Sequence, residues 1–194
     1  MNERVLNLDQ LFQHTWQLLS RASLQKKHTM RTPVLGTAGT NGPNLRTVVL
    51  RKVDQQVKSV FFFTDRRSEK VKDIRTSATT AVTFYDPKKQ FQITLKGNAR
   101  LHAQDELAQS FWERVPSFAH KDYSSVLAPG TPIEAPGRPM EGQDSSDSGY
   151  VNFVVIELVA NSIDCLQLSR EGHVRAKYTR KGKTNEWESV WVVP

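Results

Sequence analysis

The segment FFFTDRRSEKVKDI, residues 61–74, changes within a few positions from an apolar run to a charged one. Three consecutive aromatic residues are typical of a strand in a buried core, and the residues after Ser68 have helical spacing. We therefore expect a strand, a turn and a helix in this order. Such a junction can bind an anion, because the first turn of a helix has unpaired N–H groups and the positive end of the helix dipole.

The alternative interpretation of this junction is purely structural. In that case Ser68 caps the helix, and the basic side chains of Arg66, Arg67 and Lys70 are solvated. The segment taken alone favours this alternative. The choice between the two therefore depends on the rest of the chain.

Extended segments lie on both sides of the junction. Residues 31–54 contain two extended runs separated by turn residues at 39–43. Further strands are expected at 57–65, 79–86, 91–102, 151–168, 172–180 and 186–193, and helices at 6–23 and 105–115. Short strands in hairpin order with few helices predict a mainly β (β+α) fold, an antiparallel sheet closed into a barrel with helices packed outside.

The bulk properties limit the class of protein. A chain of 194 residues is sufficient for one domain, which we expect to span residues 1–194. No apolar run is long enough to cross a bilayer, the N-terminus does not resemble a secretory signal, and Cys165 is the single cysteine. We expect a cytoplasmic protein.

Residues 128–149 are rich in Pro, Gly, Ser and Asp, so we expect a flexible loop there.

Common catalytic motifs are missing from the sequence. It has no cysteine cluster, no paired histidines with metal-ligand spacing, no G-x-S-x-G and no glycine-rich nucleotide loop, so we expect no metal site. Basic and amide groups on strands remain. Alternation places Arg46, Val48 and Leu50 on one face of an extended run, and Arg51 on the other. Gln92 offers an amide donor and acceptor suited to a planar ring.

Three motifs together carry a family resemblance. RTVVLRK (46–52), FFTDRRSEK (62–70) and QITLKG (92–97) resemble, in order and spacing, the motifs of the pyridoxamine 5'-phosphate oxidase-like family. Members of this family are FMN-binding split barrels. The resemblance covers about residues 31–101 and implies an antiparallel split β-barrel with flanking helices.

The resemblance also implies roles for individual residues. Arg46 and Lys70 would bind the FMN phosphate with Ser68 at the helix start, and Gln92 would meet the pyrimidine edge of the flavin. Arg51 and His173 would be on the substrate side. The implied cofactor-binding residues are Arg46, Thr47, Val48, Arg51, Phe63, Thr64, Ser68, Lys70, Gln92, Ser124 and Arg175. The flavin itself would perform the chemistry, so no catalytic side chain is assigned.

The chain departs from the family pattern and is a divergent member by this comparison. Glu69 replaces a phosphate-side arginine, for which Arg66 or Arg67 would have to substitute. Near the C-terminus Leu166 replaces a tryptophan, and Glu171 replaces the arginine that holds the substrate phosphate. A carboxylate at that position opposes a phosphate by about 1–4 kcal/mol in a partly buried site. The resemblance therefore supports the cofactor more strongly than the vitamin substrate.

The function we expect is that of an FMN-dependent oxidoreductase, with two-electron (hydride) transfer between a small substrate and the flavin. The family implies a homodimer with FMN at the interface. One alternative is a non-catalytic flavin-binding carrier or sensor. Another is a nucleic-acid-binding barrel, suggested by the net charge of +7. Strands that alternate aromatic and basic residues are not evident, so we expect neither nucleic acid nor membrane as a partner.

Overall fold

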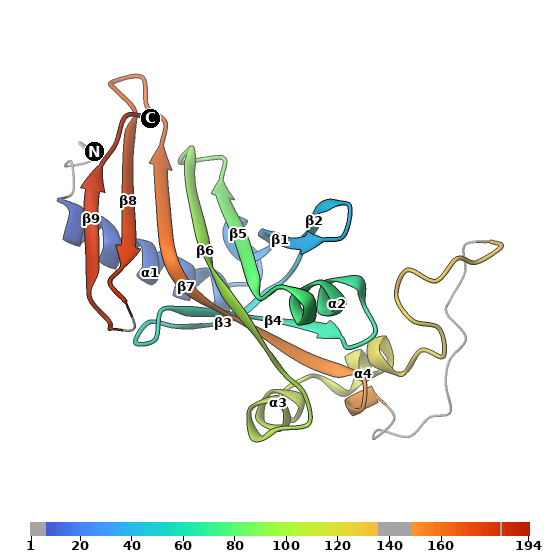
Figure 1. Cartoon of the computed structure of the whole chain (residues 1–194). Coiled ribbons are helices and arrows are strands. Elements are labelled where there is room, and N and C mark those ends of the chain that lie inside the picture. The colour runs from blue at the N-terminus through green and yellow to red at the C-terminus, as the bar shows by residue number, and fades with distance from the viewer. Residues whose placement is uncertain (1–6, 136–148, 183) are drawn as a thin grey trace.

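Nine antiparallel strands organise the computed structural model, which describes residues 7–135, 149–182 and 184–194 (Figure 1). The pairing order is β2-β1-β5-β6-β7-β4-β3, with β8 and β9 added beside β7. The strands are β1 (Val34–Gly39), β2 (Gly42–Thr47), β3 (Leu50–Asp54), β4 (Ser59–Asp65), β5 (Thr79–Asp86), β6 (Phe91–His102), β7 (Phe153–Gln167), β8 (Val174–Arg180) and β9 (Trp187–Trp191). The expected antiparallel split-barrel fold with flanking helices is confirmed, although the described pairings do not close the sheet into a ring.

Strand β7 is the element at which the sheet divides. Its first half, Phe153–Val159, pairs with β4, and residues 162–167 pair with β8, while β6 follows β7 along both halves. The register between β6 and β7 shifts next to Gly97. A Cβ atom at Gly97 would lie 1.9 Å from the carbonyl oxygen of Val159, so this crossing requires glycine.

The extended run at residues 42–54 differs from the expectation of one continuous strand. Strand β2 pairs with β1 and ends at Thr47, whereas β3 begins at Leu50 and pairs with β4. Between them, the N–H of Val48 donates to the carbonyl oxygen of Pro33 at 3.0 Å. The chain therefore changes partner strands within one alternating segment, which sequence periodicity cannot reveal.

Among the described residues, the helices with defined bounds that flank the sheet are α1 (Leu8–Leu24), α2 (Glu69–Thr76), α3 (Glu106–Trp112) and α4 (Ser117–Ser124). A capping box between Asn7 and Gln10 begins α1. The helix expected at 105–115 ends at Trp112 in the structure, and α4 was not expected. Pro116 precedes the first turn of α4, a position where its missing N–H costs nothing.

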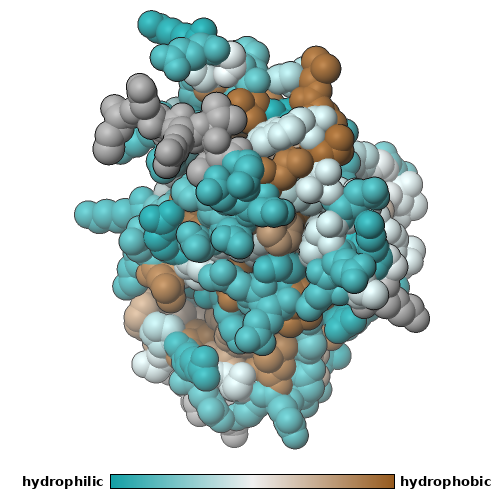
Figure 2. Space-filling view, turned by 90° about the vertical axis from the view of Figure 1, so that its left-hand side faces the viewer, coloured by the Kyte–Doolittle hydropathy of each residue, from teal (hydrophilic) through white to brown (hydrophobic). Residues whose placement is uncertain are grey.

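Two apolar clusters lie on different sides of the sheet. The larger one packs α1 onto the strands and includes the fully buried Trp16, Phe84 and Tyr178. The smaller one lies under α3 and includes Phe61, Phe111 and Phe153. The surface on the β9 side of the molecule is mainly hydrophilic, with apolar side chains between the polar ones (Figure 2).

One of the expectations lies partly outside the described residues. Of the loop expected at 128–149, residues 136–148 lie outside the described residues. In the part of the chain that is described, no helix has the length and apolar character needed to cross a membrane.

Candidate functional site

The start of α2 presents several unpaired hydrogen-bond donors. Ser68 occupies the N-cap position, but its Oγ donates to the carbonyl oxygen of Asp65 at 2.7 Å and makes no capping bond to the helix. Thr64 Oγ1 lies 3.1 Å from Ser68 Oγ and accepts from Lys70 Nζ at 3.1 Å. Among the described hydrogen bonds, none uses the backbone N–H of Glu69 or Lys70. These N–H groups can therefore donate to a bound anion.

Arg46 extends from β2 towards the same helix. Its Nη1 donates to Thr37 Oγ1 at 2.6 Å and to the carbonyl oxygen of Asn44 at 3.0 Å, and its Nη2 lies 3.6 Å from Asp73 Oδ2. Burial alone would raise the pKa of Asp73, but hydrogen bonds from Thr37 and Asn44 and the charge of Arg46 outweigh it and lower that pKa. The buried carboxylate thus stays charged and fixes the guanidinium beside α2.

Lys70 and Arg46 place two cations close to each other. Burial lowers the pKa of Lys70, and the positive charge of Arg46 lowers it further, ahead of the opposing effects of Asp65 and Glu69. Two neighbouring cations at a helix N-terminus repel each other unless an anion lies between them. Arg46, Thr64, Ser68 and Lys70, which we call the α2 group, can therefore hold a phosphate.

The two arginines of the turn do not replace the cation lost at Glu69. Arg67 forms two hydrogen bonds to Asp65, at 3.0 and 2.6 Å, and a third to the carbonyl oxygen of Ser125 at 2.8 Å. Arg66 donates to the carbonyl oxygen of Val151 at 3.2 Å. Both side chains fasten the turn to neighbouring segments instead of adding to the α2 group.

A second set of residues lies next to Thr64 in the sequence, around Phe63. The guanidinium carbon of Arg51 lies 5.1 Å from the centre of the Phe63 ring. Tyr123, on the unexpected helix α4, interacts electrostatically with Arg51, and burial raises its pKa to about 12. Ser124, which the sequence assigned to the cofactor-binding residues, donates from its Oγ to the carbonyl oxygen of Lys121 at 3.2 Å.

Thr47 and Val48 lie between these two sets, where β2 ends. Thr47 is exposed, and Val48 packs partly against the larger apolar cluster. Thr47 and Val48 belong to the short segment that connects Arg46 with Arg51, five residues further along the chain. Direct contacts thus bring together Thr64, Ser68 and Lys70, and Arg46 is close enough for its charge to lower the pKa of Lys70. Thr47, Val48, Arg51 and Phe63 are adjacent to these residues in the chain.

Gln92 and Arg175 lie in a different part of the sheet. Gln92 pairs with Leu166 across β6 and β7, and Leu166 pairs with Arg175 across β7 and β8, so the three side chains follow one row. Arg175 donates two hydrogen bonds to Asp164, at 3.0 and 2.8 Å, which raise its pKa. This row differs from the α2 group in its position and in its face of the sheet.

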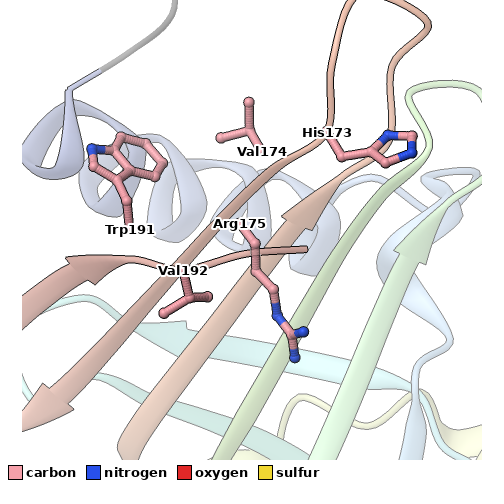
Figure 3. A pocket seen from close by; sticks show the side chains of 5 residues that line it. All are labelled: His173, Val174, Arg175, Trp191 and Val192. Carbon is pink, nitrogen blue, oxygen red and sulfur yellow. The ribbon is translucent and has the colours of Figure 1, made fainter.

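His173 and Arg175 border a shallow pocket of about 220 Å³ at the ends of β8 and β9. Arg175 and Val192 project to one side of this strand pair, whereas Trp191 projects to the side of α1 (Figure 3). The ring nitrogen Nδ1 of His173 accepts from the backbone N–H of Ser169 at 3.2 Å. The exposed turn that carries His173 also carries Glu171.

Strand register places the two groups on opposite faces of the sheet. Arg46 pairs with Leu35, which is buried and belongs to a row with Val82 and Leu95. Gln92 is three residues from Leu95 on β6, so it faces the opposite side of the sheet and is displaced by about 10 Å along the strand. Arg175 shares the row of Gln92, two strands away.

Metal ligands do not gather in the described part of the chain, where no group of three or more His, Cys, Asp or Glu side chains could hold a metal ion.

A family model matches the part of the chain that contains the α2 group. The model for the pyridoxamine 5'-phosphate oxidase FMN-binding domain matches residues 13–103, which include Arg46, Lys70 and Gln92 but end before Tyr123 and Arg175. A curated pyridoxine/pyridoxamine 5'-phosphate oxidase from Anaeromyxobacter dehalogenans is 27% identical over 136 residues, which are 66% of this chain and 67% of that protein.

Two solved structures are similar over almost the whole chain. A pyridoxamine 5'-phosphate oxidase-related, FMN-binding protein from Nostoc punctiforme has a TM-score of 0.73 and 25% identity, with 94% of this chain and 96% of that chain covered. PhzG from Burkholderia lata, solved with tetrahydrophenazine-1-carboxylic acid, has a TM-score of 0.71 and 16% identity, with coverage of 99% and 95%. The second likeness concerns the fold alone.

Proposed function

Because this chain belongs to the pyridoxamine 5'-phosphate oxidase-like family, we propose that it is an FMN-dependent oxidoreductase acting on a small substrate. The observation that carries this proposal is the convergence of Arg46 and Lys70 on the start of α2, where backbone N–H groups are unpaired. A dianionic phosphate matches two cations and a helix N-terminus. The net charge of +7 alone does not indicate which kind of anion the protein binds.

The residues of the α2 group fit the phosphate end of FMN. Lys70 and Arg46 would supply charge, and Ser68 and Thr64 would supply hydroxyl groups within one hydrogen-bonded network. Glu69 adds a negative charge in the first turn of α2, close enough to affect the pKa of Lys70, so the site would contain one cation fewer than the family pattern. When bound, FMN supplies the two-electron (hydride) chemistry, while the protein supplies binding and orientation.

The positions of the remaining predicted residues support a homodimer. Gln92 and Arg175 lie on the opposite face from Arg46, so a flavin held by all three requires groups from two copies of the chain. We propose that each FMN lies at the interface, with its phosphate on the α2 group of one copy and its ring near Gln92 and Arg175 of the other. Isologous contact of two copies gives two such sites.

Pyridoxamine 5'-phosphate is a poor candidate for the substrate. Glu171 replaces the arginine that holds the vitamin phosphate in the family, Leu166 replaces a tryptophan, and Asp164 already binds the guanidinium of Arg175. An added phosphate would face these carboxylates. We therefore propose that the substrate is a small molecule without a phosphate ester. We also propose that the protein is located in the cytoplasm.

Anaerobic reduction tests the catalytic part of the proposal. The FMN-loaded protein is mixed with NADH, NADPH or a panel of small amines, and loss of the oxidised flavin absorbance is followed over time. Catalytic reduction by one of them, and reoxidation on admitting oxygen or another acceptor, is the expected result. FMN that stays oxidised with every donor would favour a non-catalytic carrier or sensor, the alternative to which the changes at Leu166 and Glu171 point.

A further inference from the structure

Asp65 connects the α2 group to a neighbouring arginine. Its carbonyl oxygen accepts from the backbone N–H of Ser68 at 3.1 Å and from Ser68 Oγ at 2.7 Å. Its carboxylate accepts from the backbone N–H of Arg67 at 2.8 Å, from Nε at 3.0 Å and from Nη2 at 2.6 Å. The side chain of Asp65 is only 5% exposed, so these bonds are shielded from water. One buried residue therefore joins Ser68, at the start of α2, to the guanidinium of Arg67.

Arg67 connects Asp65 to the end of α4, which lies close to the turn before α2 (Figure 1). Its Nη1 donates to the carbonyl oxygen of Ser125 at 2.8 Å and to that of Val126 at 3.4 Å. A guanidinium can bind both sides because its five N–H groups form a planar fork, which a lysine does not have. The position of Ser125 thus depends on the turn that leads into α2.

A second set of hydrogen bonds joins the same turn to α4. The backbone N–H of Arg66 donates to the carbonyl oxygen of Asn152 at 2.7 Å, and its guanidinium donates to the preceding carbonyl group at 3.2 Å. Asn152 Nδ2 in turn donates to the carbonyl oxygen of Tyr123 at 2.8 Å. Residues 123–126 and 149–152, which we call the anchor segments, are therefore bonded both to the turn and to each other.

Helix α4 has little packing of its own to fix it. None of the described residues Ser117–Ser124 is buried, and eight residues are too few for a helix to be stable alone. The helix contacts the smaller apolar cluster through the rings of His120 and Tyr123. An element with so few buried contacts opens locally at a low cost in free energy, so the hydrogen bonds at its end strongly affect how often it opens.

A phosphate on the α2 group would restrain the turn from its other side. It would accept from the backbone N–H groups of Glu69 and Lys70, which no described hydrogen bond uses, and from the ammonium group of Lys70. Ser68 lies between these groups and Asp65. A fixed start of α2 thus favours the arrangement of the turn in which the two arginines reach the anchor segments.

We propose that Arg67 is a positioning residue that couples phosphate binding at the α2 group to the anchor segments, so that FMN stabilises the end of α4 through its phosphate. This inference rests on the proposed function, because it assigns a regulation of the same site. Arg67 thereby has a role other than substituting for the cation lost at Glu69. Because coupling is reciprocal, a change that loosens the anchor segments must weaken FMN binding by the same factor.

Hydrogen–deuterium exchange of the FMN-free full chain tests the coupling with three probes, FMN, riboflavin and inorganic phosphate. At saturation, FMN and phosphate should slow exchange of the backbone N–H groups in residues 117–126 and 149–152 about fivefold. Riboflavin, which lacks the phosphate, should leave the exchange unchanged, as should chloride at the same ionic strength as the phosphate. Equal slowing by riboflavin and FMN would show that the flavin ring acts directly, and would overturn the coupling.

Arg67→Lys keeps a positive charge beside Asp65 but loses the planar fork. In this variant FMN affinity should fall about fivefold, phosphate should no longer slow exchange in the anchor segments, and riboflavin affinity should stay the same. Arg75→Lys, at an exposed position in the last turn of α2, is the matched control and should behave as the wild-type protein. The same behaviour of both variants would overturn the role of Arg67.

Asn152→Ala keeps the coupling testable if Arg67→Lys fails to fold. It removes the hydrogen bond between the two anchor segments, so phosphate should slow exchange in residues 117–126 less than in the wild-type protein. Asn98→Ala, at an exposed position on β6, should leave the effect of phosphate unchanged. No difference between Asn152→Ala and Asn98→Ala would contradict the coupling.

FMN binding is measured on the same samples by absorbance. A wild-type protein that binds no FMN contradicts the proposed function, and the exchange measured with phosphate then still decides on the coupling. Bound FMN that leaves exchange in the anchor segments unchanged contradicts the coupling alone.

Discussion

Arg46 and Asp73 join the edge of the sheet to helix α2, with 3.6 Å between Arg46 Nη2 and Asp73 Oδ2. Asp73 is buried and also accepts hydrogen bonds from Thr37 at 2.6 Å and Asn44 at 3.0 Å. A carboxylate with three partners is held firmly, and it holds the guanidinium in turn. The phosphate-binding arginine of our proposal is therefore oriented by the protein itself, before the cofactor binds.

Replacing Asp73 by Asn should destabilise the fold by about 1–3 kcal/mol at neutral pH, because a buried network loses its charge. The pKa of Asp73 is lowered in the folded state, so its contribution is present above the unfolded value of about 3.8 and is lost as pH falls through the lower folded value. Urea unfolding at neutral and acidic pH measures both effects. The exposed Asp122→Asn is the control, and an equal change in both variants would contradict the role of Asp73.

Replacing Lys70 by Arg should alter how FMN binding depends on pH. Burial and Arg46 lower the pKa of Lys70 below 10.5, so the wild-type protein should lose FMN affinity as pH rises through that lowered value. Arginine stays charged throughout this range, and the variant should keep its affinity. Equilibrium dialysis at increasing pH measures the difference. Lys72→Arg, two residues along α2, should behave as wild type, and an identical loss in all three proteins would remove Lys70 from the site.

Replacing Gly97 by Ala should destabilise the protein by about 1–3 kcal/mol or more, because the new Cβ would overlap the carbonyl oxygen of Val159 at the register shift between β6 and β7. Gly36→Ala is the matched control. Its Cβ would lie 3.1 Å from the end of the flexible Leu45 side chain, so its loss should be smaller. Chemical denaturation compares the two. A larger loss in Gly36→Ala would be inconsistent with the crossing described here.

Co-expression of two inactive variants tests whether the site is shared between copies. One variant carries Arg46→Ala and Lys70→Ala, and the other carries Gln92→Ala and Arg175→Ala. Each should bind FMN weakly alone, but a mixed dimer contains one site built from intact groups, so about one quarter of all sites should recover at random pairing. Absorbance after purification gives the occupancy. No recovery, with mixed dimers demonstrated by differential tags, would show that each site lies within one chain.

The sequence was informative where the decisive interactions are local. The strand, turn and helix around Ser68 follow from a change in apolar pattern within fourteen residues, and the structure confirms them. The change of partner strands after Thr47 depends on Pro33 and on β4, which are not adjacent in the sequence. Helix α4 is short and has no buried residue, and its place depends on contacts of Tyr123 with Trp112 and Phe153, so no periodic signal marks it.

The same distinction applies to the candidate site. The junction at residues 61–74 places Ser68 and Lys70 together, and the contacts of both with Thr64 agree with that placement. Arg46 was assigned to the same group by the family resemblance. Alternation along β6 indicated the face of Gln92, but the sequence did not show that Arg175 would share its row on β8. That arrangement depends on long-range pairing, and it is the basis for expecting a second copy of the chain at the site.

Binding of FMN at the α2 group is the central claim, and equilibrium titration of the FMN-free protein with FMN tests it most directly. We expect binding of close to one FMN per chain, with a loss of at least about a hundredfold in affinity when Arg46→Ala and Lys70→Ala are combined. Riboflavin, which lacks the phosphate, should bind the wild-type protein and the double variant alike. Tight FMN binding that survives in the double variant, or no FMN binding by the wild-type protein, would contradict the account.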